Sequence, residues 1–225
     1  PWRVSKKSTK KLYYRLLSEF MLQQTQVKTV LPYFKKFLLH FPTLVSLSKS
    51  NEKKVLKLWE GLGYYRRARN LLATAKILVK EHNSKLPNEI IDIKRLPGVG
   101  DYTANALLAF IYDQPTIAID GNVKRVFSRI VNRSETTIDL VKIIESNSKF
   151  LFNTKRNSDF AEALMEFGAL ICKPKEPECF KCNIRTSCKY FKSDKKFKQI
   201  KKIKPLEKSY DIFCSINKTK NKIAR

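Results

Sequence analysis

Apolar residues recur every three to four positions along most of this chain, which is the spacing of amphipathic helices. Asn51 is a suitable N-cap for one short helix, and Gly61 is a suitable residue to end it. Residues 113–119 form the connection most expected to be extended. The pattern predicts an all-α protein with helices near residues 11–22, 25–40, 51–59, 65–82, 89–95, 103–112, 122–132, 138–152 and 158–171.

The composition changes after Lys189. Residues up to about 207 are rich in lysine and are typical of a basic linker. From Tyr210 onward, apolar and polar residues alternate through Ile212, Cys214 and Ile216, and Ile223 follows a polar turn. We therefore expect a strand and the start of a second one, as at the beginning of a further domain.

The net charge of +26 is very high for 225 residues. Such a field attracts polyanions, although a lysine-rich composition of the kind an AT-rich genome produces also contributes. There is no run of 18 apolar residues to span a membrane, and the basic, polar start is unlike a signal peptide. We expect a cytoplasmic, nucleoid-associated bacterial protein that binds nucleic acid.

Residues 96–100, Leu-Pro-Gly-Val-Gly, lie between two predicted helices and form a helix-hairpin-helix pattern. Gly98 and Gly100 are expected to allow backbone conformations that are closed to other residues. Their amide N–H groups could then approach a DNA phosphate at the start of the second helix. The alternative is an ordinary corner between two helices.

Four cysteines lie close together near residue 180, namely Cys172, Cys179, Cys182 and Cys188. Clustered thiolates of this kind can hold a metal ion or an iron–sulfur cluster. The spacing alone permits zinc, although zinc modules usually have two close pairs and this chain has one. Two disulfides in a secreted domain are the other alternative, but clustered free cysteines suit a reducing compartment better.

Several segments together resemble the adenine-specific mismatch DNA glycosylases of the endonuclease III helix-hairpin-helix superfamily. In order along the chain they are residues 18–27, 59–65, 96–100, 119–125 and 163–169. The cysteine spacing is also that of the family, which implies that the four thiolates hold a [4Fe–4S] cluster.

The resemblance implies two helical lobes with DNA in the cleft between them, and a monomeric protein. One lobe would be the module of residues 20–119, which contains the hairpin. The other would be a cluster domain built from residues 1–19 and 120–190. Residues 191–225 would form the linker and the start of a C-terminal domain.

Release of adenine requires a protonated acid for the leaving base and a carboxylate for the cationic sugar. Glu19 lies in an apolar helix, where desolvation would raise its pKa. The resemblance implies that Glu19 is the general acid and that Asp120, with Asn122 nearby, stabilises the sugar. Without the resemblance, Glu19 could be a surface residue and Asp120 an N-cap.

Tyr102 stands where the lyase branch of the superfamily has a nucleophilic lysine. Because a phenol cannot form an imine, Tyr102 favours a monofunctional, water-using glycosylase. The competing hypotheses are a bifunctional lyase for oxidised pyrimidines and a non-catalytic DNA-binding relative.

The expected substrate is double-stranded DNA with adenine opposite 8-oxoguanine or guanine, and the adenine must be flipped out of the stack. The resemblance places one set of residues at the opposite guanine, with Tyr64 wedged into the stack: Gln24, Thr25, Leu62 and Tyr64. A second set would lie near the adenine pocket: Arg3, Gln23 and Glu166. Lys124 and the hairpin glycines would contact the DNA backbone.

Overall fold

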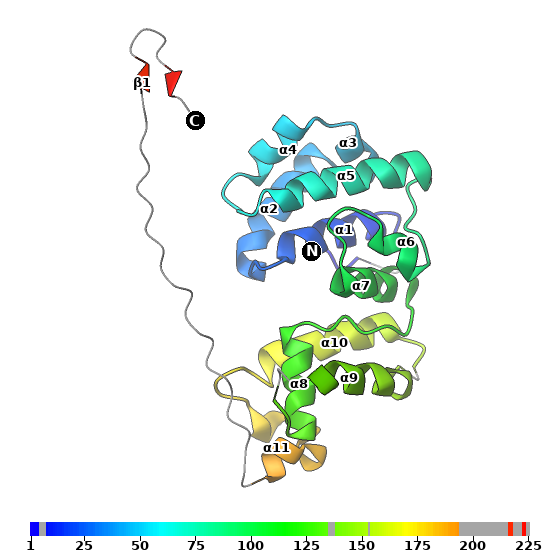
Figure 1. The fold of residues 1–225 in the computed structure, drawn as a ribbon, viewed down its shortest axis with the longest axis vertical. Helices are drawn as coiled ribbons and strands as arrows, with labels where there is room; N and C mark the ends of the chain where they lie inside the picture. The colour runs from blue at the N-terminus through cyan, green and yellow to red at the C-terminus, as the bar shows by residue number, and fades with distance from the viewer. Residues whose placement is uncertain (5–7, 135–137, 153, 194–215, 218–221, 224–225) are drawn as a thin grey trace.

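Helices make up nearly all of the regular structure in the computed structural model, which describes residues 1–4, 8–134, 138–152, 154–193, 216–217 and 222–223. The prediction of an all-α protein is confirmed (Figure 1). The α-helices are α1 (Lys11–Leu22), α2 (Val27–His40), α3 (Leu44–Ser48), α4 (Glu52–Trp59), α5 (Arg66–Glu81), α6 (Ile90–Lys94), α7 (Asp101–Tyr112), α8 (Gly121–Val131), α9 (Ile138–Leu151), α10 (Asn157–Leu170) and α11 (Lys189–Lys192). Two short 3₁₀ turns, Cys179–Lys181 and Arg185–Ser187, precede α11.

The ends of these helices follow local signals in the sequence. The Asn51 side chain caps α4 by accepting a hydrogen bond from the Lys54 amide at 2.9 Å, as predicted. Helix α3 was not predicted, because its five residues are too few to show a period; Thr43 caps it. Helix α7 begins at Asp101, two residues before its predicted start.

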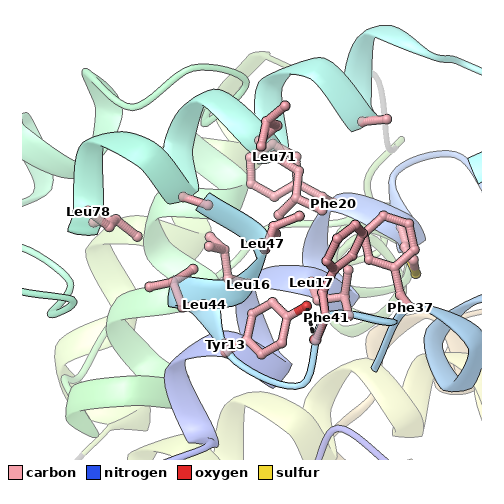
Figure 2. Close-up of a cluster of buried hydrophobic side chains, with 14 of the residues drawn as sticks. Tyr13, Leu16, Leu17, Phe20, Phe37, Phe41, Leu44, Leu47, Leu71 and Leu78 are labelled. Atoms are coloured by element: carbon pink, nitrogen blue, oxygen red, sulfur yellow. Dashed lines mark hydrogen bonds between the residues drawn. The ribbon is translucent and has the colours of Figure 1, made fainter. Parts of the chain in front are cut away.

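The first hydrophobic core is formed by α1 to α7 together with Trp2. Figure 2 shows its centre, where side chains from α1, α2, α3 and α5 meet around Phe20, Phe37 and Leu71. The Tyr13 hydroxyl donates a hydrogen bond of 2.7 Å to the Phe41 carbonyl, so the buried phenol is satisfied. This core holds α1, and therefore Glu19, in a fixed position.

The second core packs α8, α9 and α10 against the opposite face of α7. Ala104 and Leu107 of α7 belong to the first core, whereas Ala106, Ala109 and Phe110 belong to the second. Helix α7 is thus shared by the two lobes and lies between them in Figure 1.

The N-terminal residues contribute apolar side chains to the first core and ion pairs to α10. Residues 1–19 were assigned to the cluster lobe, but Trp2, Tyr13, Leu16 and Leu17 are buried in the first core. The apolar stripe of α1 predicts a buried face but carries no information about which lobe buries it. After residue 120, side chains of α8, α9 and α10 are buried in the second core.

Near the end of the chain, β1 (Ile216–Asn217) pairs antiparallel with β2 (Lys222–Ile223). The predicted strand residues Tyr210, Ile212 and Cys214 lie outside the described residues. Within the described part of the chain, no helix is both long and apolar enough to cross a bilayer.

Candidate active site and thiol centre

Glu19 lies on the buried face of α1 with 5% of its surface exposed. Burial raises the pKa of its carboxyl from the ordinary 4.5 to about 7. Arg15 opposes this rise, Glu162 and Asp120 reinforce it, and a hydrogen bond with Tyr102 opposes it. Glu19 therefore keeps its proton at a pH where an exposed glutamate is ionised.

Asp120 is the N-cap of α8, and its carboxylate is held at both oxygens. Oδ1 accepts the Val123 amide at 2.7 Å, and Oδ2 accepts the Asn122 side-chain amide at 2.8 Å. The predicted active-site residue Asp120 thus also caps a helix, and Asn122 lies beside it.

Tyr102 is in the first turn of α7 and interacts with Glu19. Burial, followed by the charges of Glu19 and Asp120, raises the pKa of its phenol. Its hydroxyl also points toward the Met165 sulfur at 4.0 Å. The structure thus brings Glu19, Tyr102 and Asp120 from three helices into one interacting group.

The hairpin turn between α6 and α7 confirms the prediction for only one of its two glycines. Gly98 has φ +78°, and a Cβ there would lie 2.6 Å from the Asn70 side chain. Gly100 has φ −97°, so the prediction that it needs a conformation closed to other residues was wrong; it is the N-cap of α7. The Gln23 side chain reaches this turn and donates to the Gly98 carbonyl at 3.3 Å.

Arg67, at the start of α5, joins two loops that sequence reasoning placed near DNA. Its guanidinium donates to the Met21 carbonyl at 2.8 Å, to the Thr25 hydroxyl at 3.0 Å and to the Gly63 carbonyl at 3.2 Å, and it also bonds the Gln23 carbonyl. The loops before α2 and before α5 are therefore held together by one buried cation.

Tyr64 projects from the loop before α5 with 62% of its surface exposed. Its ring lies 5.2 Å from the Arg67 guanidinium, and its φ is +49°. Tyr64, Gln23, Gln24 and Gly98 border a hollow of about 390 Å³. Leu62 is instead buried in the first core, so of this pair only Tyr64 presents its side chain at the surface.

Arg3 bridges two carboxylates of α10. It lies 3.0 Å from Glu162 Oε2 and 2.6 Å from Glu166 Oε1. Glu162 also pairs with Arg15 of α1. The predicted pocket residues Arg3 and Glu166 are thus in contact, and a chain of charges joins α10 to α1 near Glu19.

Lys124 lies in the first turn of α8. With Asp101, Tyr102 and Asn105 of α7, it lines a polar hollow of about 370 Å³. Glu145 and Ser148 of α9 line the same hollow, so Lys124 borders a space that α7, α8 and α9 share.

The four thiols converge on one cavity beside α8. Cys172, Cys179, Cys182 and Cys188 all line it, together with aliphatic and aromatic side chains that include Val126, Ile130, Phe167 and Tyr190. The cysteines are free, and burial followed by the other three thiols raises the pKa of Cys179. Among the described residues, no three His, Cys, Asp or Glu side chains meet closely enough to hold a single metal ion.

Two arginines of α8, one turn apart, fix the loop that carries these thiols. Arg125 donates to the Cys172 carbonyl at 2.8 Å and to the Asn122 side chain at 2.8 Å. Arg129 lies 3.3 Å from the Cys172 sulfur and donates to the Lys173 carbonyl at 2.7 Å. The thiol loop and the Asp120 turn are therefore connected through α8.

Sequence reasoning missed these arginines as well as Arg15, Arg67 and Glu162. Arg125 and Arg129 do have a signal, since they are four residues apart on one face of an otherwise amphipathic helix. The ion-pair partner of Arg15 and the α1-side partners of Arg67 lie more than 40 residues away in the sequence, so no local pattern marks these contacts.

Residues 17–149 match the HhH-GPD superfamily base excision DNA repair proteins. The adenine DNA glycosylase of Buchnera aphidicola subsp. Baizongia pistaciae is 42% identical over 199 residues, which are 87% of this chain and 54% of the relative. That of Mus musculus is 36% identical over 198 residues, which are 85% of this chain and 38% of the relative.

Among solved structures, that of a thermostable thymine-DNA glycosylase matches with a TM-score of 0.74 at 26% identity, covering 85% of this chain and 88% of that one. The chain spans about half the length, or less, of the curated relatives described above. With its two helical lobes, its hairpin and the match over residues 17–149, the chain belongs to the HhH-GPD superfamily of base excision DNA repair proteins.

Proposed function

We propose that this chain is a monofunctional glycosylase that hydrolyses the N-glycosidic bond of adenine opposite 8-oxoguanine or guanine in double-stranded DNA. The observation that carries the proposal is a buried Glu19 with a raised pKa, in one group with Asp120 and Tyr102. The names of the similar proteins from Buchnera aphidicola and Mus musculus support adenine as the base.

In this mechanism the protonated Glu19 donates its proton to N7 of the flipped adenine. The C1′–N9 bond breaks, its electron pair leaves with the base, and the sugar becomes cationic. The Asp120 carboxylate, oriented by Val123 and Asn122, opposes that positive charge. Water then adds to C1′, and its proton returns to the Glu19 carboxylate, which restores the enzyme.

DNA would lie across the loops that Arg67 joins. Tyr64 would fill the gap left by the flipped base, while Gln24 and Thr25 would face the opposite guanine, with Leu62 supporting the Tyr64 loop from the core. The Gly98 turn and Lys124 would contact phosphates. Arg3, Gln23 and Glu166 would border the adenine, and one copy of the chain would suffice.

We also propose that the four cysteine thiolates hold a [4Fe–4S] cluster. The four thiols line one apolar cavity, which Arg129 and residues of α11 also line, and this arrangement fits such a group. Bound there, the cluster would supply a rigid support for the basic loop around Lys181 and for Arg125. Replacing Cys182 with Ser should remove the iron and the brown colour, whereas Cys214→Ser should keep both; unchanged iron content in the first variant would contradict the assignment.

Base release from a panel of duplexes tests the proposed function. Duplexes with adenine opposite 8-oxoguanine, adenine opposite guanine and thymine opposite guanine would be compared in single-turnover assays. The proposal predicts release of adenine from the first two, loss of release in Glu19→Gln, and intact thymine in the third. Release of thymine in place of adenine would assign the chain to another substrate.

A further inference from the structure

Arg15 and Glu19 lie on the same buried face of α1, four residues apart. This is the spacing at which opposite charges on a helix pair with each other. Arg15 is 6% exposed and Glu19 is 5% exposed, so water would screen such a pair only weakly. A free Arg15 would therefore be expected to hold Glu19 as a carboxylate, the wrong state for an acid.

The structure has Arg15 engaged elsewhere. Its guanidinium pairs with Glu162 of α10 and stacks 4.7 Å from the Phe110 ring of α7. Glu162 is itself fixed from the other side by Arg3 at 3.0 Å, and its side chain is 14% exposed. Arg15 of α1 thus pairs with a carboxylate of α10 that Arg3 already holds in position.

We propose that Glu162 is a positioning residue, which binds the Arg15 guanidinium against α10 and so prevents it from forming an ion pair with Glu19. The proposal rests on the acid role of Glu19 given above and assigns the control of that role to Glu162, which lies on a different helix, α10. Glu162 need not touch the DNA for this purpose.

The other charged and titratable groups around Glu19 do not offer this control. Asp120 at the start of α8 and Tyr102 on α7 interact with Glu19, and each already has a part in the proposed site. Of the groups that act on the pKa of the Glu19 carboxyl, Arg15 is the cation, and it lowers that pKa, while Glu162 raises it. Removing Glu162 therefore changes two influences in the same direction, toward an ionised Glu19.

The experiment measures the titration of Glu19 in two ways. The first is the carboxyl ¹³C chemical shift of Glu19, assigned by difference from Glu19→Gln; the second is the single-turnover rate of adenine release from pH 5 to pH 9. The variants are Glu162→Gln, Arg15→Met and the double variant Arg15→Met/Glu162→Gln. Asp159→Asn removes an exposed carboxylate from the same α10 helix and is the matched control.

Glu162→Gln should lower the titration midpoint of Glu19 by about one pH unit or more, the effect of a close opposite charge. Because only protonated Glu19 acts, the rate at pH 8 should then fall about tenfold for every pH unit by which the midpoint moves down, and the rate at pH 5 should stay near that of the unsubstituted protein. The double variant lacks the cation, so its midpoint should return to the original value or above it. Arg15→Met alone should move the midpoint upward, and Asp159→Asn should leave it unchanged.

A rate that falls equally at every pH in Glu162→Gln, with no change in the titration of Glu19, would overturn the proposal. So would a midpoint that stays low in the double variant. If the unsubstituted protein releases no adenine at any pH, the proposed function fails, but the carboxyl titration still decides whether Glu162 controls Glu19.

Discussion

At the scale of single residues, the cost of burying the charged form of Glu19 accounts for its proposed chemistry. Desolvation is the largest cause of its raised pKa, and the hydrogen bond with Tyr102 and the charge of Arg15 only partly reverse it. The Asp120 oxygens instead accept hydrogen bonds from the Val123 amide and the Asn122 side chain. The two carboxyl groups thus have different surroundings, which suits the different roles proposed for them.

Replacing Glu19 with Gln should abolish adenine release and stabilise the protein at alkaline pH. Folding raises the pKa of Glu19. The contribution of this carboxyl to the stability of the folded protein is therefore fully present below about pH 4.5 and is lost as the pH rises through about 7. The free energy of unfolding of the variant should therefore exceed that of the unsubstituted protein by roughly 3 kcal/mol at pH 8, and by much less at pH 5.

Denaturant unfolding of both proteins at the two pH values measures this difference. A variant that is less stable than the unsubstituted protein at pH 8 would show that Glu19 is not destabilised by burial.

At the scale of elements, the site depends on the close approach of α10 to α8. Gly168 permits that approach, because a Cβ there would lie 2.6 Å from the Asn122 Cβ and 3.0 Å from its carbonyl oxygen. The Gly168 carbonyl also accepts a hydrogen bond of 2.6 Å from Arg125. One glycine thus sets the distance between the helix that carries Glu166 and the turn that carries Asp120.

Gly168→Ala should therefore push α10 away from the Asp120 turn. We expect a loss of stability of about 1–3 kcal/mol from overpacking and a fall in the adenine-release rate that exceeds any loss of DNA binding. Gly121→Ala, whose added Cβ meets nothing within 4 Å, is the matched control for stability. Denaturant unfolding and single-turnover assays on both variants test this prediction. Equal unfolding free energies and equal adenine-release rates for the two variants would show that the close contact of Gly168 with Asn122 is unimportant.

The sequence predicted long elements well and interactions between elements poorly. The apolar stripes gave most of the long helices to within about two residues, because periodicity is a local property. Helix α3 is too short to show a helical period. Which lobe buries the apolar residues of 1–19 depends on tertiary packing, which a local pattern does not report. Glu19, Asp120 and Tyr102 were identified by resemblance, whereas the Arg15–Glu162 pair joins residues 147 positions apart and has no signature along the chain.

At the scale of the whole molecule, the net charge of +26 would contribute electrostatically to the proposed DNA binding. A protein that neutralises six or more phosphates loses on the order of 10³-fold or more in affinity between 50 and 200 mM salt. The proposed contacts are the Gly98 turn, which precedes α7, the helix of Tyr102, and Lys124 of α8, the helix that Asp120 caps. Binding and chemistry would then share these two helices.

Lys124→Gln should weaken DNA binding similarly for all sequences and reduce the slope of log affinity against log salt by about one. Lys80→Gln is the matched control, since Lys80 is exposed near the end of α5, the helix that begins at Arg66 beside the Tyr64 loop. Titrations of labelled duplex at several salt concentrations give both slopes. Equal slopes for the two variants would show that Lys124 does not contact a DNA phosphate.

In the proposed mechanism, Glu19 and water release adenine without a covalent enzyme intermediate. The most direct test is a single-turnover assay on a duplex with one adenine opposite 8-oxoguanine, analysed with and without alkali and with borohydride trapping. The proposed mechanism predicts adenine loss, strand breakage only after alkali, and no trapped protein–DNA adduct. Direct strand breakage with a trapped adduct, or no loss of adenine, would contradict it.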